Sequence, residues 1–229
     1  MLKGKIKDLL GTELAIIQAP MAGVQDSDLA IAVCEAGGLG SIPCGMLDIE
    51  TTVTQIQKVK VGTDNPYNLN FFCHQMPAYD EKQHQVWQAS LKPHFEALNI
   101  ECQSRPNSAN RTPFNHDMAD AIEVFKPEFI SFHFGLPDKT LLDRVKSWGT
   151  KVVSSATTLA EALWLEEHGV DGIIAQGLEA GGHRGMFLSN DISTQVSSLA
   201  LIPQIVDKVN VPVIAAGGIS NAEGVKAAL

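Results

Sequence analysis

One loop of this chain, residues 175–185 (AQGLEAGGHRG), concentrates the residue types that could do chemistry. His183 and Arg184 stand between the pair Gly181-Gly182 and Gly185. Glycines let backbone N–H groups come close to an anion or a flat ring because no Cβ intervenes, and histidine can donate, accept or carry a proton near neutral pH. A flexible turn with a solvated His–Arg pair is the alternative. We favour a ligand-binding loop, because it directly follows a short apolar run that predicts a buried strand.

Further candidates follow other apolar runs of the sequence. They are Pro20, Met21 and Ala22; Asn70 with His74; His133; Gln176; and Gly217 with Gly218. The Gly217-Gly218 pair is expected to open a helix, where N–H groups and the positive end of the helix dipole would cradle a phosphate. A plain strand-to-helix turn would have the same composition. His133 lies between two phenylalanines, so a histidine satisfied inside the core is an equal alternative to a catalytic one. His74 is the weaker candidate.

The apolar runs predict seven strands, at residues 14–21, 39–44, 67–72, 129–135, 151–156, 172–175 and 211–218. Helical spacing and capping residues predict helices at 27–36, 48–59, 81–98 with an interruption at Pro93, 119–125, 138–148 and 158–168, and the start of another at 220–223. Capping boxes of the form Ser/Thr-x-x-Glu begin at Thr158 and at Ser220.

This alternation favours a parallel α/β fold, a TIM (β/α)8 barrel that lacks the eighth βα unit in this chain. A doubly wound sheet is disfavoured, because no Gly-x-Gly-x-x-Gly turn follows the first strand. In a barrel the candidate residues converge on one rim, at the carboxyl ends of the strands. We expect residues 1–229 to form a single domain with an elaborated connection at about 76–118, and to be the N-terminal part of a longer protein.

Composition limits the classes of binding partner and site that this chain could have. The formal net charge of −9 disfavours nucleic acid and anionic membrane surfaces, because a polyanion would be repelled. The four cysteines (Cys34, Cys44, Cys73 and Cys102) are far apart with no Cys-x-x-Cys pair, so neither a metal site nor a disulfide framework is predicted. No run resembles a targeting or membrane segment. A cytoplasmic protein fits these features, and a homodimer is left open.

Four motifs, in order along nearly the whole chain, resemble the FMN-dependent nitronate monooxygenases, also called 2-nitropropane dioxygenases. They are residues 18–23 (QAPMAG), 68–72 (NLNFF), 175–177 with 179–183 (AQG and EAGGH), and 215–219 (AAGGI). The family's second phosphate-binding loop, which follows strand eight, has no counterpart in this chain.

The resemblance implies a TIM barrel that binds FMN non-covalently and oxidises alkyl nitronates, such as propionate 3-nitronate, with O2. It places the isoalloxazine ring against Pro20, Met21 and Ala22. Asn70, Gln176, Gly181 and Gly182 would bind the ring and the ribityl chain, and Gly217 and Gly218 would bind the phosphate. His133 and His183 match the family's active-site histidines. Two alternatives stay open: an FMN-dependent NAD(P)H reductase of enoyl-acyl-carrier-protein or quinone substrates, and a non-catalytic flavin-binding fragment.

Overall fold

A computed structural model describes residues 3–76, 78–101 and 111–229. The chain forms two compact units: residues up to His74 together with Thr112–Leu229 form the first, and Gln75–Arg111 form the second. Cys102 and residues 103–110 of the elaborated connection expected at about 76–118 lie outside the described residues. That residues 1–229 form one FMN-binding domain stays a prediction.

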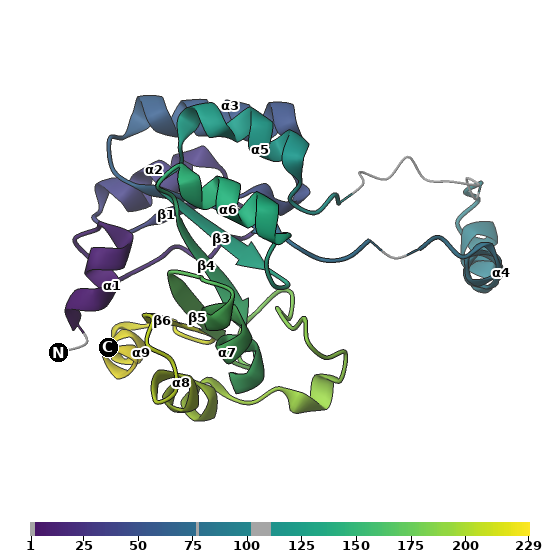
Figure 1. Ribbon diagram of the computed structural model, residues 1–229. Coiled ribbons are helices and arrows are strands. Elements are labelled where there is room, and N and C mark those ends of the chain that lie inside the picture. Colours follow the sequence, from purple (N-terminus) through teal and green to yellow (C-terminus); the bar gives the residue numbers. More distant parts are fainter. Residues whose placement is uncertain (1–2, 77, 102–110) are drawn as a thin grey trace. The chain divides into compact units, whose positions relative to one another are not determined.

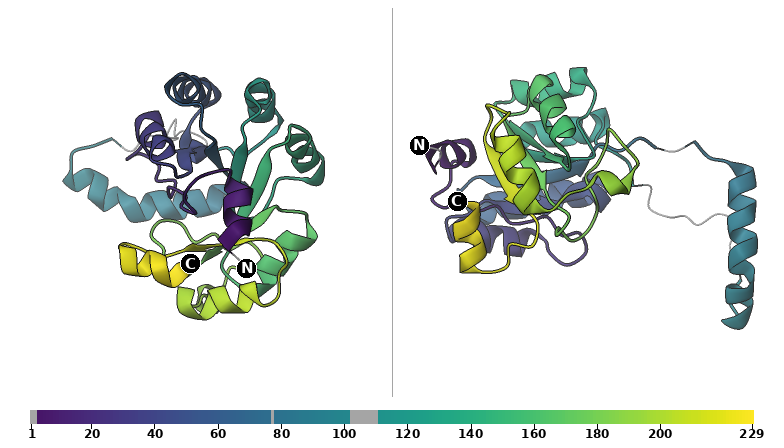
Figure 2. Two further views of the ribbon diagram at one scale, coloured as in Figure 1. Left: turned by 90° about the vertical axis from the view of Figure 1, so that its left-hand side faces the viewer. Right: turned by 90° about the horizontal axis from the view of Figure 1, so that it is seen from below.

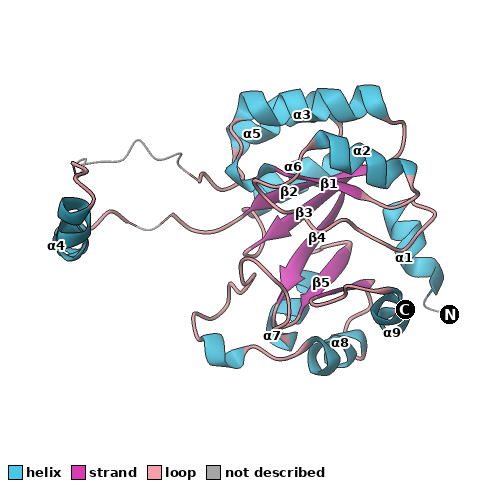
Figure 3. Cartoon of the chain, turned by 180° about the vertical axis from the view of Figure 1, so that it is seen from behind, coloured by secondary structure: helices cyan, strands magenta, loops and turns pink. Residues whose placement is uncertain are grey.

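The first unit is built on six parallel strands whose order in the sheet follows the sequence (Figures 1 and 3). They are β1 (Gly40–Pro43), β2 (Tyr67–Phe72), β3 (Phe129–His133), β4 (Lys151–Ala156), β5 (Gly172–Gln176) and β6 (Val213–Ala216). The pairing is in register from strand to strand, for example Asn70 with Ser131 and Gln176 with Ala216. A parallel sheet in sequential order with a crossover between each pair of strands is the arrangement of a (β/α)8 barrel, of which these strands form a curled part.

Helices lie along the outer face of the sheet (Figure 2). They are α2 (Ser27–Glu35), α3 (Ile49–Gly62), α5 (His116–Ile122), α6 (Lys139–Ser147), α7 (Leu159–Glu167), α8 (Ser198–Val206) and α9 (Ala222–Ala228). Short 3-10 turns are η1 (Cys44–Met46), η2 (Glu123–Phe125) and η3 (Ile192–Thr194). Acidic or amide side chains cap several helices, as where Asp48 accepts from the N–H of Thr51 and Asn115 from that of Met118.

Strand side chains alternate between two environments. Those facing the helices are apolar and form the main core, including Ile42, Leu69, Phe71, Ile130 and Phe132, all of them buried. Those facing the concave side form an apolar layer near the start of the strands and a polar layer nearer their carboxyl ends. This alternation places polar chemistry inside the curve of the sheet and leaves the apolar packing outside it.

An N-terminal helix, α1 (Lys3–Leu10), completes the apolar layer on the concave side. Its buried Leu10 packs with Leu39, Phe129 and Val153. A Cβ on Gly172 would lie 2.8 Å from Cδ2 of Leu9 in this helix, so a larger residue at the start of β5 would displace the end of the Leu9 side chain. The sequence analysis did not predict α1 or α8.

The first predicted strand is wrong. Residues 14–21 form a single parallel bridge between Ile17 and Leu39. The segment does lie beside β1, since Leu39 N–H donates to the Ile16 carbonyl and Gln18 N–H to that of Leu39, both at 2.9 Å. Leu14 and Ile16 are 44% and 42% exposed, so this run is not covered on both faces as its apolar composition suggested.

Two details of the predicted helices also differ. The last helix is capped by Asn221, whose side chain accepts from Gly224 N–H, and not by Ser220. In the second unit, α4 (Glu81–Ala97) continues through Pro93, where an interruption was expected. Proline leaves one helical carbonyl without its donor, and here that carbonyl belongs to Ala89, which is exposed to water.

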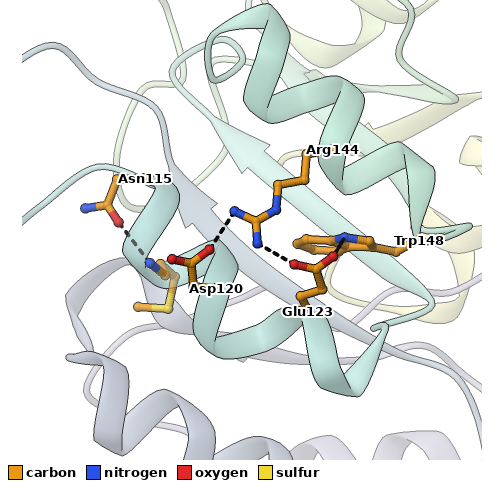
Figure 4. Close-up of polar contacts among 6 residues, drawn as sticks. Asn115, Asp120, Glu123, Arg144 and Trp148 are labelled. Atoms are coloured by element: carbon orange, nitrogen blue, oxygen red, sulfur yellow. Dashed lines mark hydrogen bonds and ion pairs between the residues drawn. The ribbon is translucent and has the colours of Figure 1, made fainter.

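Arg144 links α6 to α5 and η2 on the outer face of the sheet (Figure 4). Its guanidinium contacts Asp120 at 2.7 Å and also Glu123, which in turn accepts from the indole N–H of Trp148 at 3.0 Å. The hydrogen bond from Arg144 lowers the pKa of Glu123. These contacts fix α5 and η2 against α6, behind the strand that ends at His133.

The contact between β1 and α2 gives a test of this packing. A Cβ on Gly40 would lie 2.1 Å from the backbone oxygen of Ala30 and 2.8 Å from Sγ of Cys34. Because a backbone atom cannot turn aside, Gly40→Ala is expected to lower the free energy of unfolding by about 2 kcal/mol or more in urea denaturation. Gly181→Ala is the matched control, since a Cβ there meets no atom of the described chain within 4 Å. Equal stability of the two variants would contradict this packing.

Candidate active site

Three histidines gather around two phenylalanines at the carboxyl ends of β2 and β3. The ring centroid of Phe72 lies 5.3 Å from that of His183, 5.9 Å from that of His133 and 6.3 Å from that of His74. Phe134 lies 4.6 Å from His133 and 5.8 Å from His183. The structure therefore brings the two predicted catalytic histidines to one place, and it adds His74, which the sequence analysis had ranked lower.

His133 is the last residue of β3 and points into the concave side of the sheet. Its Nδ1 lies 2.9 Å from Oγ of Ser155 on the neighbouring strand β4. Burial lowers the pKa of His133 to about 4; the charge of His183 acts in the same direction, and a hydrogen bond with the His183 backbone opposes it. The imidazole is therefore neutral at neutral pH, so it can accept a proton or a hydrogen bond but carries no charge.

His183 is exposed, in the loop that follows β5. Gln176, at the end of that strand, holds the loop backbone: its Nε2 donates to the His183 carbonyl at 2.9 Å, and its Oε1 accepts from Gly185 N–H at 2.7 Å. Gly185 is buried so closely that a Cβ would lie 2.7 Å from Cε1 of His133. The loop thus covers His133 with backbone while leaving the His183 ring accessible.

The first part of this loop is hydrogen-bonded to the start of α8. Glu179 accepts from the N–H and the hydroxyl of Ser198, the first residue of α8, at 2.8 and 2.7 Å, which lowers the pKa of Glu179. Arg184 donates to the Ala180 carbonyl within the loop. Both charged side chains therefore shape the backbone of the loop, and the solvated His–Arg pair considered from the sequence does not describe Arg184.

A polar layer lies beneath these residues. Asn70 donates to the carbonyl and hydroxyl of Ser131 at 3.1 and 3.0 Å, and Asn68 donates to the hydroxyls of Ser41 and Ser131 at 3.0 and 2.9 Å. Gln18 accepts from Ser41 N–H at 3.1 Å. Among the described residues, the buried Nε2 of Gln18 and Oδ1 of Asn68 have no partner. The two-residue period of β2 could have predicted Asn68 from Asn70, because both face the same side.

The remaining predicted residues lie at the edges of this region. Pro20, Met21 and Ala22 are exposed at the end of the segment beside β1. Gly181 and Gly182 are exposed, and a Cβ on either meets no described atom within 4 Å. Gly217 and Gly218 have φ of +135° and +68°, and they lie against Ser198 and Glu179. The pair does not open α9 directly, since that helix begins at Ala222.

Two features are absent from the described residues. No group of three or more histidine, cysteine or acidic side chains there could hold a metal ion. In that same part of the chain, no helix is both long and apolar enough to cross a membrane.

Comparisons with known proteins identify the family of this chain. The sequence profile of the nitronate monooxygenases matches residues 3–229. A nitronate monooxygenase of Paraburkholderia phytofirmans is 41% identical over 99% of this chain and 62% of its own length. The solved nitroalkane oxidase of Streptomyces ansochromogenes is 33% identical with a TM-score of 0.82, covering 98% of this chain and 65% of that one. FabK from Thermotoga maritima is 27% identical with a TM-score of 0.69, covering 97% and 57%. The chain thus spans less than two thirds of the length of these relatives.

The lowered pKa of His133 predicts a pH dependence of stability. Because the folded pKa of about 4 lies below the ordinary 6.5, protonation favours the unfolded chain. The free energy of unfolding is therefore unaffected by His133 above pH 6.5. It decreases as the pH falls from 6.5 toward 4, by at most about 3 kcal/mol. In urea denaturation across this range, the loss of stability at low pH should be smaller in His133→Gln than in the wild type, because both proteins keep the same carboxylates and only the wild type has the buried imidazole. Parallel pH profiles would contradict the buried, neutral imidazole.

Proposed function

Because the chain belongs to the nitronate monooxygenase family, a family of flavoenzymes, we propose that it binds FMN and oxidises alkyl nitronates with O2. The observation that carries the proposal is the gathering of His133 and His183 around Phe72, beside a loop in which Gly181 and Gly182 face open space. Propionate 3-nitronate is the substrate type that the resemblance suggests. A cytoplasmic location belongs to the same proposal and rests on composition alone.

The residues present fit a flat, phosphorylated cofactor. A Cβ on Gly181 or Gly182 would meet no described atom within 4 Å, so the backbone there leaves room for a flat ring to lie against it. We assign Pro20, Met21 and Ala22 to one face of the isoalloxazine. Asn70, Gln176, Gly181 and Gly182 would bind the ring and ribityl chain, and Gly217 with Gly218 the phosphate. Gln176 already holds the loop, which leaves one amide hydrogen and one oxygen lone pair for the cofactor.

When bound, FMN would accept electrons from the substrate. A nitronate is already a carbanion-like anion, so the protein need not remove a proton first. Its residues must hold the substrate, exclude water and balance one negative charge. His133 is neutral at neutral pH and cannot balance that charge. His183 is exposed and stands against the same phenylalanine ring, so we assign the charge-balancing role to His183.

His133 would then have a different task. Its Nδ1 is engaged with Ser155, which leaves Nε2 as the second ring nitrogen of a neutral imidazole. A neutral imidazole can take the α-proton of a nitroalkane if neutral substrates are also used, and its low pKa makes it a weak base for that purpose. Nitronates, which need no such step, are therefore the better substrates for this site.

The role of His183 is tested by His183→Asn, which removes the ionisable ring and keeps a hydrogen-bonding side chain. We expect flavin to stay bound and kcat/KM for propionate 3-nitronate to fall by about 100-fold or more, the scale of a positioned acid–base or charge-stabilising group. Absorbance measures the flavin and initial rates measure the turnover. If this variant keeps near-normal turnover while His133→Asn destroys it, the two roles must be exchanged.

Flavin binding is tested by Gly181→Val. The valine side chain would fill space that no atom of the described chain occupies within 4 Å, so the protein should fold normally but lose the cofactor. The measurement is the flavin-to-protein ratio after purification. The control is Leu178→Val, which changes an exposed residue of the same loop and should retain flavin. Gly23→Val is unsuitable as a control because the backbone φ of Gly23 is +82°, which valine rarely adopts. Stoichiometric flavin in Gly181→Val would refute the site.

The reaction class is decided by anaerobic stopped-flow mixing of the flavin-loaded protein. Bleaching of the flavin by nitronate, and not by NAD(P)H, is expected for a nitronate monooxygenase. Rapid bleaching by NAD(P)H alone would instead identify the reductase considered as the alternative. A protein that binds flavin but is reduced by neither would be the non-catalytic fragment.

A further inference from the structure

Glu161 is a buried carboxylate that the proposed chemistry does not use. It lies in the first turn of α7 and is only 1% exposed. A capping box would send its side chain back to the N–H of Thr158, and Thr158 does accept from the N–H of Glu161. The carboxylate instead accepts from the N–H and the hydroxyl of Thr157, at 2.7 and 2.8 Å, through Oε2.

The other oxygen of Glu161 reaches the active-site loop. Oε1 accepts from the N–H of Phe187 at 2.7 Å and from that of Leu188 at 3.2 Å. Three of the four donors around this carboxylate are backbone N–H groups, which cannot turn into acceptors. A buried anion with this set of donors is satisfied on both oxygens, and it links the turn before α7 to the loop after β5.

Glu161 and Gln176 hold neighbouring parts of the same loop. Gln176 fixes the His183 carbonyl and the Gly185 N–H, and Glu161 fixes the N–H groups two and three residues further on. At the first of these anchors, Gly185 lies against His133 and Ser155, where a Cβ would be 2.7 and 2.9 Å from their nearest side-chain atoms. The cover over His133 therefore depends on anchors at both ends.

We propose that Glu161 is a positioning residue, which acts from behind the active site by holding the loop of His183 and Gly185 against His133. The role of the loop in catalysis rests on the proposed function, but the positioning itself does not. Without an acceptor, the N–H groups of Phe187 and Leu188 would be unsatisfied, which costs free energy. Turning toward water would restore their hydrogen bonds, and the loop would move away from the strands. His133 would then lose its cover.

A second carboxylate of the same helix provides the matched control. Glu166 accepts from the N–H groups of Asn210 and Val211 at 2.6 and 3.2 Å, in the turn before β6. It therefore anchors backbone N–H groups as Glu161 does, but at the amino end of a strand. Glu166→Met and Glu161→Met each remove a carboxylate that accepts from two backbone N–H groups of a distant turn, and only the second should disturb the carboxyl-end loop.

The experiment is carried out on the intact protein by NMR, and it needs neither bound flavin nor turnover. In Glu161→Met we expect hydrogen exchange at the Gly185 amide to become about tenfold faster or more, although Glu161 does not bond to that amide. We also expect the pKa of His133 to rise from about 4 toward 6.5. The groups facing His133 are Ser155, Phe72, Phe134 and the ionisable His183, so its titration is read together with that of His183. Glu166→Met should change neither quantity.

Glu161→Asp keeps the charge and shortens the side chain by one methylene, so it decides the question if Glu161→Met does not fold. An aspartate can hold Thr157 or the loop but cannot span both, so Gly185 exchange and the pKa of His133 should again increase. Unchanged Gly185 exchange and an unchanged His133 pKa in a folded Glu161 variant would overturn the proposal. Equal changes in the Glu161 and Glu166 variants would overturn it too, since they would indicate general destabilisation. Loss of nitronate turnover with both NMR quantities unchanged would also count against positioning.

Discussion

The close approach of Gly185 to His133 is the contact on which the rest of the candidate site depends. Only a residue without a Cβ can lie there, because an added carbon would stand 2.7 Å from the imidazole. This contact lets backbone, and not a side chain, cover the end of β3. It also explains why one loop can bury one histidine and expose another. The loop is kept in that position by hydrogen bonds of three side chains, those of Gln176, Glu161 and Glu179.

His133 and His183 have the same side chain but lie in different environments. His133 lies at the end of a strand between β2 and β4, so burial lowers its pKa to about 4. His183 lies in a loop whose backbone is fixed and whose side chain is exposed. A site with one neutral and one accessible imidazole can divide its work between accepting a proton and balancing a charge. The Phe72 ring lies beside both imidazoles and adds an apolar surface to the site.

Much of the fold can be predicted from the pattern of apolar residues in the sequence, but much of the site cannot. The strands from Gly40 to Ala216 were predicted to within a few residues, because buried parallel strands are nearly continuous apolar runs. The same signal failed for residues 14–21, where an apolar run is only half covered. Sequence reasoning found His133, His183 and Gln176 as candidates from their place after strands. It could not find that Glu161 crosses to Phe187, because that contact joins residues 26 positions apart.

The position of Glu161 also shows how a capping signal can conceal another role. Thr158 and Glu161 satisfy the sequence pattern of a capping box, yet only the threonine half of that box is formed. A helix terminus beside a rim loop offers a carboxylate two sets of backbone donors, one local and one distant. The local set, at Thr157, fixes the side chain, and that fixed side chain can then hold the distant set. Anchoring of the turn before α7 and positioning of the loop after β5 are in this way two consequences of one buried anion.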